Sequence, residues 1–367
     1  MNTPRFSTNK RSDFSKTLRS RVNAYFKANN ISKHANNSMI AKTVFMLFVF
    51  LFPLILINTG WIHHGILLFI LYIVSGFGMA GIGMGIMHDA IHGSYSRNRR
   101  VNKYLGYTMN LIGANATVWK IQHNILHHTY TNIQQADDDI NVPFFLRFSP
   151  HARKHRIQKF QHIYVWFFYS ISTLLWITAK DFVRLHRYKK MGFLDRKGEY
   201  SGELLKLICW KLLYYSYALI LPLILVPLAP WIIILAFLGM HLVTGLCVSS
   251  VFQVAHIMPA TDYPEADNEG IIENDWCMHQ LATTSNFSPE SRFFSWLIGG
   301  LNYQVEHHLL PQVCHIHYRK VSHIVMQTAQ EYGLPYHIKK TFIAAIADHV
   351  RMLKHLGKHE IKSVKSA

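Results

Sequence analysis

Closely spaced histidines are the residues of this sequence whose types and spacing indicate chemistry. The chain of 367 residues contains 24 histidines. Seven of them form three dense groups: His88 and His92, then His123, His127 and His128, and then His307 and His308. Residues i and i+4 of a helix share a face, with Cβ atoms about 5–6 Å apart. The first two groups can therefore each direct two imidazoles at one metal ion.

The adjacent histidines indicate a second metal ion. Consecutive helical residues are turned by about 100°, so His127 and His128 can reach different ions, and so can His307 and His308. Seven histidines also exceed the four ligands of a structural zinc site. We therefore predict a two-metal site, with Gln304 close to it on the turn before His307. Imidazole suits zinc, copper, iron and nickel, so the ligand type alone leaves the metal open.

Residues outside the three groups are candidates for supporting roles. His256 is a candidate eighth histidine ligand, because it lies a few residues beyond the apolar segment 231–253, and His88 directly follows the segment 65–87, which we expect to end at the same membrane face. His241 lies inside the segment 231–253, and we predict a hydrogen-bonded residue of a helix bundle there. Carboxylates next to the histidines are expected to orient ligand imidazoles. These are Asp89, Asp137, Asp138, Asp139 and Glu306, although Asp137 fits a solvated loop position equally well.

Four apolar segments must position these histidines, at residues 39–58, 65–87, 206–228 and 231–253. Each is close to the ~20 residues that cross ~30 Å of hydrocarbon as a helix. The predicted fold is an all-α integral membrane protein. Four transmembrane helices form two hairpins, and a cytoplasmic helical cap holds the dimetal site. Lys211, near one end of the third segment, is expected to extend to the membrane surface. Glycines at 76, 78, 81, 83 and 85 are expected to allow close helix packing.

The distribution of basic residues predicts the orientation. Of the 38 Lys and Arg residues, eight precede residue 41, 17 lie in 88–205 and ten in 256–367, whereas the turns 59–64 and 229–230 have none. By the positive-inside bias, both termini and all histidine groups are cytoplasmic. This topology accounts for the net charge of +18, so we expect no nucleic-acid partner. A soluble protein with buried core helices is the disfavoured alternative.

Two less apolar segments, 104–118 and 163–179, are predicted to be helices in the cytoplasmic membrane interface, where Trp and Tyr are favoured. The predicted organisation is a basic N-terminal segment (1–38), a membrane domain (39–335), whose C-terminal helix covers about 318–332, and a basic tail (336–367). The four cysteines form no CxxC pair, which argues against a disulfide scaffold or a cysteine zinc site. The polar N-terminal segment does not resemble a signal peptide.

The sequences HDAIHG (88–93), HNILHHTYTN (123–132) and QVEHHLLP (304–311) resemble the three histidine boxes of the membrane fatty acid desaturases. Their order, and their placement after the apolar segments, match over about residues 40–335. The resemblance implies an enzyme with two iron ions that uses O2 and two electrons to insert a cis double bond into an acyl chain. It implies a catalytic metal site formed by His88, His92, His123, His127, His128, His307 and His308, with His256 and Gln304 as further metal ligands.

Gln304, in place of a histidine at the start of the third box, resembles the front-end desaturases, which oxidise between an existing double bond and the carboxyl end. The stretches 276–286 and 299–302 are similar to the bacterial linoleoyl-CoA desaturase branch. A His-Pro-Gly-Gly motif, the mark of a fused haem domain, is absent from the sequence. The resemblance therefore implies an external electron donor such as a ferredoxin or a cytochrome, and a location in a bacterial inner membrane.

The substrate implied is a fatty acyl chain on coenzyme A, a carrier protein or a membrane lipid. Trp119, four residues before His123, is expected either to line the acyl channel or to anchor the chain at the interface. Two other functions remain open at this point. A membrane hydroxylase shares the first hydrogen abstraction with a desaturase. A metal transporter would carry ionisable ligands near the membrane midplane, but no acidic residue occurs in the four apolar segments.

Overall fold

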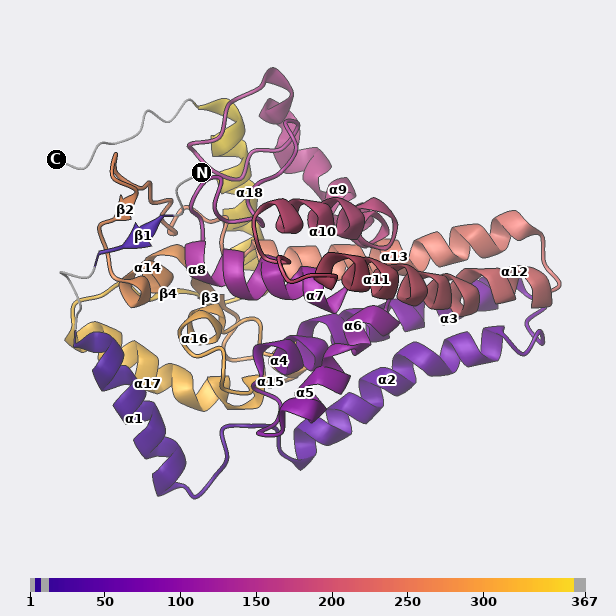
Figure 1. Ribbon diagram of the computed structural model, residues 1–367, viewed down its shortest axis with the longest axis horizontal. Helices are drawn as coiled ribbons and strands as arrows, with labels where there is room; N and C mark the ends of the chain where they lie inside the picture. Colours follow the sequence, from indigo (N-terminus) through magenta and orange to yellow (C-terminus); the bar gives the residue numbers. More distant parts are fainter. Residues whose placement is uncertain (1–3, 8–12, 360–367) are drawn as a thin grey trace. The chain divides into compact units, whose positions relative to one another are not determined.

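The computed structural model describes residues 4–7 and 13–359, and this part of the chain is mostly helical (Figure 1). It divides into two compact units. The apolar unit comprises residues 35–121 and 167–249, and the polar unit comprises residues 1–34, 122–166 and 250–367. The predicted terminal segments 1–38 and 336–367 fall largely within the polar unit, and their residues 1–3, 8–12 and 360–367 lie outside the described part.

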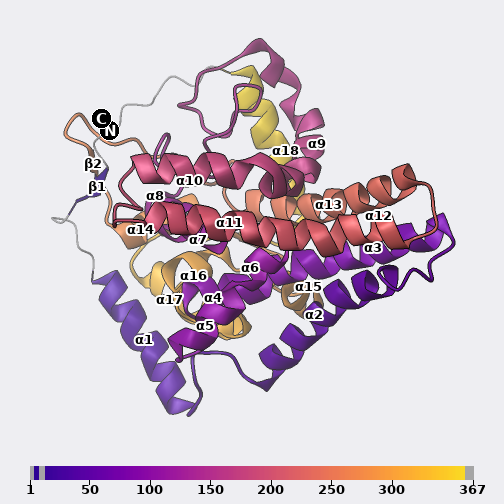
Figure 2. The same cartoon turned by 45° about the vertical axis from the view of Figure 1, so that its right-hand side comes forward.

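The apolar unit is built from long apolar helices joined by short ones, and α2, α3, α12 and α13 lie side by side in both views (Figures 1 and 2). Its elements, including most of α9 and α13, are α2 (Asn37–Ile57), α3 (Gly65–Gly81), the π-helical turn η1 (Ile82–Ile86), α4 (Met87–His92), α5 (Arg99–Gly106), α6 (Thr108–Leu111), α7 (Ala116–Lys120), α9 (Gln161–Leu175), the π-helical turn η4 (Trp176–Lys180), α10 (Asp181–Lys190), α11 (Glu199–Tyr215), the π-helical turn η5 (Ser216–Ile220), α12 (Leu221–Leu225) and α13 (Pro230–Gln253).

Five continuous helices in the described residues are long and apolar enough to cross a membrane. They are 37–57, 65–92, 156–190, 199–225 and 230–253. Four of them match the predicted spans: 37–57, 65–92, 199–225 and 230–253. The helix 37–57 ends one residue before the end of the predicted span, and 199–225 ends at Leu225, two residues before Pro227, instead of at residue 228. The remaining helix, 156–190, contains the segment 163–179 and is 35 residues long. These helices support a mostly α-helical membrane protein.

Glycines allow α3 to pack closely against two neighbours, as the sequence predicts. A Cβ atom on Gly76 would lie 2.7 Å from the carbonyl oxygen of Met240 in α13, and Gly78 lies against the backbone of Phe50 in α2. Hydrogen bonds join the same helices, because the Ser75 hydroxyl donates to the Phe50 carbonyl (2.7 Å) and the Thr244 hydroxyl donates to the Gly76 carbonyl (2.9 Å). The glycines therefore serve helix packing.

The segment 104–118 is not one helix, which corrects the prediction for it. It is divided among the end of α5, α6 and the start of α7. Gly113 has a φ of +87°, a left-handed conformation that interrupts the helix. Asn115 then starts α7 by accepting a hydrogen bond from the Val118 amide (2.9 Å).

Lys211 does not extend to a surface, because its side chain is buried. Its ammonium donates to the Asp181 carboxylate (3.0 Å) and to the carbonyls of Trp176 (2.8 Å) and Gly113 (3.1 Å). A buried charge is tolerated when an opposite charge and further hydrogen bonds satisfy it. The sequence-based expectation was wrong because Asp181, 30 residues earlier, gives no local sign of this contact.

The polar unit surrounds a core formed by one face each of α1, α14, α16 and α17. Apolar residues four positions apart on α1, from Phe14 to Phe26, are buried in it. The elements, besides the start of α9 and the end of α13, are β1 (Arg5–Phe6), α1 (Phe14–Ala28), the π-helical turn η2 (Ile121–His127), α8 (His128–Tyr130), the 3₁₀ turn η3 (Arg156–Phe160), β2 (Ile271–Ile272), α14 (Trp276–Thr283), β3 (Ser285–Phe287), α15 (Arg292–Leu297), α16 (Gln304–Leu309), the 3₁₀ turn η6 (His315–His317), α17 (Tyr318–Glu331), β4 (His337–Lys339) and α18 (Phe342–Lys358).

Two parallel strand pairs connect distant parts of the polar unit. Arg5 of β1 pairs with Ile271 of β2, and Ser285 of β3 pairs with His337 of β4. The helix α17 matches the predicted helix at 318–332. Beyond it, β4 and the buried face of α18 show that the described part of 336–367 is folded into the unit.

Candidate metal centre

The second histidine group lies on a π-helical turn. His123 and His127 belong to η2, and His128 starts α8. A π-helical turn bonds residue i to residue i+5, so it is wider than an α-helical turn and is frequent at functional sites. It brings His123 and His128, five residues apart, to a Nε2–Nε2 distance of 3.3 Å.

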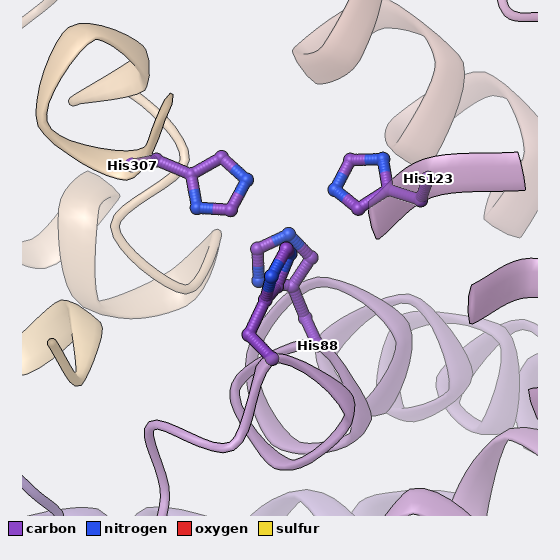
Figure 3. A group of neighbouring side chains, drawn as sticks. His88, His123 and His307 are labelled. Carbon is purple, nitrogen blue, oxygen red and sulfur yellow. The ribbon is translucent and has the colours of Figure 1, made fainter. Parts of the chain in front are cut away.

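The third group lies on the short helix α16, which begins at Gln304. Gln304, His307 and His308 occupy positions i, i+3 and i+4, so they share one face. All three side chains are buried. Figure 3 shows the rings of His307 and His123 directed toward the same space. Their centroids are 5.7 Å apart with nearly parallel planes.

Six histidines of the polar unit form two triads. The first triad consists of His127, His256 and His308, whose ligand nitrogens all lie within 4.8 Å of one another. The second triad consists of His123, His128 and His307, in which His128 Nε2 lies 3.3 Å from His123 Nε2 and 2.9 Å from His307 Nε2. Each adjacent pair of histidines is thus divided between the triads.

Outer partners fix the rings of the first triad at Nδ1. His127 Nδ1 donates to the Asp137 carboxylate, at 3.1 and 3.0 Å from its two oxygens. His308 Nδ1 donates to Gln280 Oε1 (2.7 Å), and His256 Nδ1 lies 3.4 Å from the Thr283 carbonyl oxygen. An imidazole whose Nδ1 carries the proton directs the Nε2 lone pair toward the space between the rings.

The Nε2 atoms of this triad indicate that the residues fit a metal ion. All three are buried and make no hydrogen bond of normal geometry with a described residue, although Gln304 lies beside His256. Leaving a buried polar atom unpartnered costs about 1–3 kcal/mol. In the second triad, the Nε2 spacings match two imidazoles on one ion, since nitrogens about 2.1 Å from a metal and at right angles lie about 3.0 Å apart.

Electrostatics keep the first triad suited to metal binding. Burial lowers the pKa of His308 well below its usual value, and the neighbouring histidines lower it further. Burial and His127 likewise lower the pKa of His256. Burial also disfavours the charged form of His127, but the Asp137 carboxylate outweighs this effect and the pKa of His127 is raised. A carboxylate on Nδ1 makes the imidazole a more basic ligand.

Gln304 is buried beside His256. Neither its amide oxygen nor its amide nitrogen makes a hydrogen bond of normal geometry with another described residue. Its oxygen is therefore available as a metal ligand or as an acceptor for metal-bound water.

The first histidine group belongs to the apolar unit. His88, also labelled in Figure 3, and His92 lie on α4, which continues the helix of α3 through the π-helical turn η1. Their ring centroids are 4.8 Å apart. The Trp119 ring of α7 lies 5.6 Å from His88 and 6.0 Å from His92. Within this unit, the Trp119 ring therefore packs beside the histidine pair.

The predicted carboxylates differ in their contacts. Asp137 is fully buried against His127, so the reading of it as a solvated loop residue is wrong. Asp139 Oδ2 lies 4.0 Å from His123 Nδ1, and Asp89 Oδ1 lies 3.9 Å from His88 Nδ1. Glu306 instead accepts hydrogen bonds from Asn286 and Tyr336, both at 2.8 Å, and burial raises its pKa to about 7. Asp138 is also buried.

Several positioning residues were not found by sequence reasoning. Gln280 holds His308, and the Tyr318 hydroxyl lies 3.3 Å from His307 Nδ1. Asn132, with a φ of +60°, donates from its backbone to Asp137 (2.9 Å) and from its side chain to the His256 carbonyl (3.1 Å). Asn is among the few non-glycine residues that tolerate this conformation. Its place in HNILHHTYTN was the one available signal.

The sequence matches the fatty acid desaturase family over residues 60–340. The sn-1 linoleoyl-lipid 6-desaturase of Synechocystis sp. is 34% identical over 360 residues, which cover 94% of this chain and 96% of the relative. The protein of the same name from Arthrospira platensis is 33% identical over 354 residues, covering 94% and 92%. The acyl-lipid (8-3)-desaturase of Physcomitrium patens is 32% identical over 359 residues, covering 95% of this chain and 73% of the relative.

Proposed function

The chain belongs to the fatty acid desaturase family and is an oxidoreductase, and from this premise we propose a specific reaction. The enzyme inserts a cis double bond on the carboxyl side of an existing double bond, in an acyl chain carried by a membrane lipid. Three observations support this choice: Gln304 opens the third box, two relatives are named linoleoyl-lipid 6-desaturases, and another is an acyl-lipid (8-3)-desaturase.

The cofactor in this proposal is a pair of iron ions. The supporting observation is the first triad, whose three buried Nε2 atoms lack partners. His127, His256 and His308 would hold one ion and His123, His128 and His307 the other, and His88, His92 and Gln304 are the further ligands that the sequence predicts. When bound, two such ions supply O2 activation and removal of hydrogen from an unactivated C–H bond.

The protein contributes orientation and the exclusion of water. Asp137 and Gln280 fix the rotation and the protonated nitrogen of His127 and His308. Trp119 is the proposed wall of the acyl channel beside His88 and His92. An external ferredoxin or cytochrome supplies two electrons, and its docking on the basic cytoplasmic face weakens with salt.

Lipid analysis of a heterologous host fed linoleate tests the reaction. We expect a product two hydrogens lighter than the substrate, with the new double bond at carbon 6 and the product recovered in intact lipid. A product heavier by one oxygen would instead identify a hydroxylase. A new bond on the methyl side of the existing one would reject the front-end assignment.

We also propose four membrane spans in two hairpins within a bacterial inner membrane, with both termini and every histidine box cytoplasmic. The fifth apolar helix, 156–190, then lies in the interface. Its last turns and the following loop carry Arg184, Arg187, Lys189, Lys190, Arg196 and Lys197. If this helix crossed the membrane alone, these six cations would be external, against the positive-inside bias.

Single cysteines at the exposed positions His63 and Lys190, in a background without the four native cysteines, test this topology. An impermeant reagent on intact cells should label position 63 and leave position 190 unlabelled. Labelling at 190 would overturn the four-span arrangement and separate His256 from the cytoplasmic histidine boxes.

A further inference from the structure

Two basic segments of the polar unit lie side by side. One is 153–163, which contains η3 and the start of α9, and the other is the last two turns of α18; α18 contacts η3, and both views show α18 beside the segment that leads into α9 (Figures 1 and 2). Hydrogen bonds fix the contact, because Gln161 Nε2 donates to the Leu353 carbonyl and Lys154 Nζ donates to the Lys358 carbonyl, both at 2.8 Å. The two segments therefore form one surface.

Little of the positive charge of this surface is used within the described fold: Lys159 Nζ lies 5.7 Å from the centre of the Phe160 ring, which is itself exposed. Arg153, Arg156, Lys159 and Lys354 are exposed, and none of them forms an ion pair with another described residue; we call these four residues the basic surface. Two carbonyls in the last turn of α18 already accept hydrogen bonds from other cations, Leu356 from Arg147 (2.7 Å) and Lys358 from Lys154 (2.8 Å). Stabilisation of the helix end therefore does not account for the four cations.

Acidic groups near the basic surface are few and already paired. The sequence has no Asp or Glu between Asp139 and Asp181, or between Asp348 and Glu360. Asp348 forms ion pairs with Lys339 and Arg351, and Glu265 lies 3.1 Å from His151. Within the part of the chain that the structure describes, no ion pair therefore compensates the positive charge of the basic surface.

Exposed apolar side chains alternate with these cations. Ile157, Phe160 and Ile163 have exposed fractions of 52%, 55% and 64%. The same helix continues to Lys190 as one of the helices apolar enough to enter a membrane. Cations interleaved with bulky apolar side chains, at the start of an apolar helix, are typical of a segment lying at the boundary between lipid headgroups and acyl chains. A soluble acidic partner would use the charges but leave the apolar residues in water.

We propose that the basic surface binds the headgroups of anionic phospholipids, while Ile157, Phe160 and Ile163 enter the headgroup–acyl boundary. The binding places this surface in the headgroup layer of the membrane. This inference goes beyond the proposed reaction and does not depend on its regiochemistry. It predicts a local preference for anionic lipid that weakens as salt screens the charges.

The test uses the full chain reconstituted into phosphatidylcholine vesicles, with a bimane fluorophore on Ile157→Cys in a background lacking the native cysteines. Brominated lipid quenches bimane on contact. At equal mole fraction, we expect brominated phosphatidylglycerol to quench about twofold more than brominated phosphatidylcholine. The quadruple variant Arg153→Gln, Arg156→Gln, Lys159→Gln, Lys354→Gln should remove this preference, as should high salt.

A matched control removes the same charge elsewhere in the polar unit, through Lys16→Gln, Arg19→Gln, Lys27→Gln and Lys320→Gln, and should retain the preference. Equal quenching by the two brominated lipids, in the protein that keeps all four cations, would overturn the proposal that the basic surface binds anionic headgroups. Quenching by soluble iodide, with none by either lipid, would place the surface in water and favour an acidic soluble protein. Metal content and desaturation, measured on the same samples, should not change in the quadruple variant, so failure of this proposal is distinct from failure of the proposed function.

Discussion

Two buried histidine environments, one in each unit, differ in how their ring nitrogens are satisfied. In the apolar unit, His241 Nε2 lies 2.7 Å from the Tyr214 hydroxyl and His241 Nδ1 lies 3.2 Å from the Thr173 hydroxyl. In the polar unit, each ring of the first triad has a partner at Nδ1 and none at Nε2. His241 is therefore a structural residue, as the sequence predicts, whereas the triad has three lone pairs directed at one space.

An unpartnered nitrogen alone does not identify a ligand. His279 is also buried in the polar unit, and neither of its ring nitrogens makes a hydrogen bond of normal geometry with a described residue. It belongs to none of the side-chain clusters in the described residues whose ligand atoms converge closely enough to hold a metal ion. The triad differs from His279 and from His241 because several unpartnered Nε2 atoms converge in it, and a partner at Nδ1 orients each ring.

The largest expected effect is that of removing a triad ligand. His308→Ala should lower desaturation by roughly 100-fold or more, because it removes an ion ligand rather than a residue that orients one. Iron per purified chain, measured by elemental analysis, should fall to about half or less, because one of the two ions loses a ligand. His279→Ala, the matched buried control, should keep its iron. Equal iron loss in both variants would show that the converging triad and the isolated His279 do not differ in metal binding.

Removing the outer support of one triad ring should have the next largest effect. Asp137→Asn keeps the shape of the side chain but removes the charge on His127 Nδ1, and such changes typically cost 10–100-fold in metal affinity or activity. Iron retention during titration with a chelator measures this loss. Glu290→Gln, an exposed carboxylate in the same unit, provides the control and should behave like the unchanged protein.

Gln304 should rank below the histidines. Gln304→His replaces one candidate ligand by another, so we expect a loss of roughly tenfold or less with iron retained, whereas His307→Ala should lose both. Product analysis and metal content, measured together, separate these outcomes. Complete and equal loss in the two variants would contradict the ranking of Gln304 as a secondary ligand.

The smallest effect on the reaction is expected at His241. His241→Phe leaves the buried Tyr214 hydroxyl without its partner, at a cost of about 1–3 kcal/mol in stability. The melting temperature in detergent should fall, while iron content and activity per folded chain should remain close to those of the unchanged protein. Loss of iron from this variant would show that a fully hydrogen-bonded histidine can still support the metal centre.

The sequence by itself determined the features that depend on local spacing. The i, i+4 histidines, the apolar lengths of α2 and α13, and the three boxes were all readable, because helical periodicity and membrane thickness fix them within a short stretch of chain. The same spacing predicted that adjacent histidines diverge. The three histidine boxes resemble those of the desaturase family, and the comparisons confirm that the chain belongs to it.

Only the tertiary structure decided which partners each buried polar group receives. The π-helical turn η2 places the His123 and His128 rings next to each other. Asp137 is buried and hydrogen-bonded to His127 instead of being solvated. Gln280, 28 residues before His308, fixes that ring, and Asp181 keeps Lys211 buried. Local spacing allows several positions and partners for a charged side chain or an imidazole. The free energy of desolvation selects among them only when distant segments of the chain have packed around that side chain.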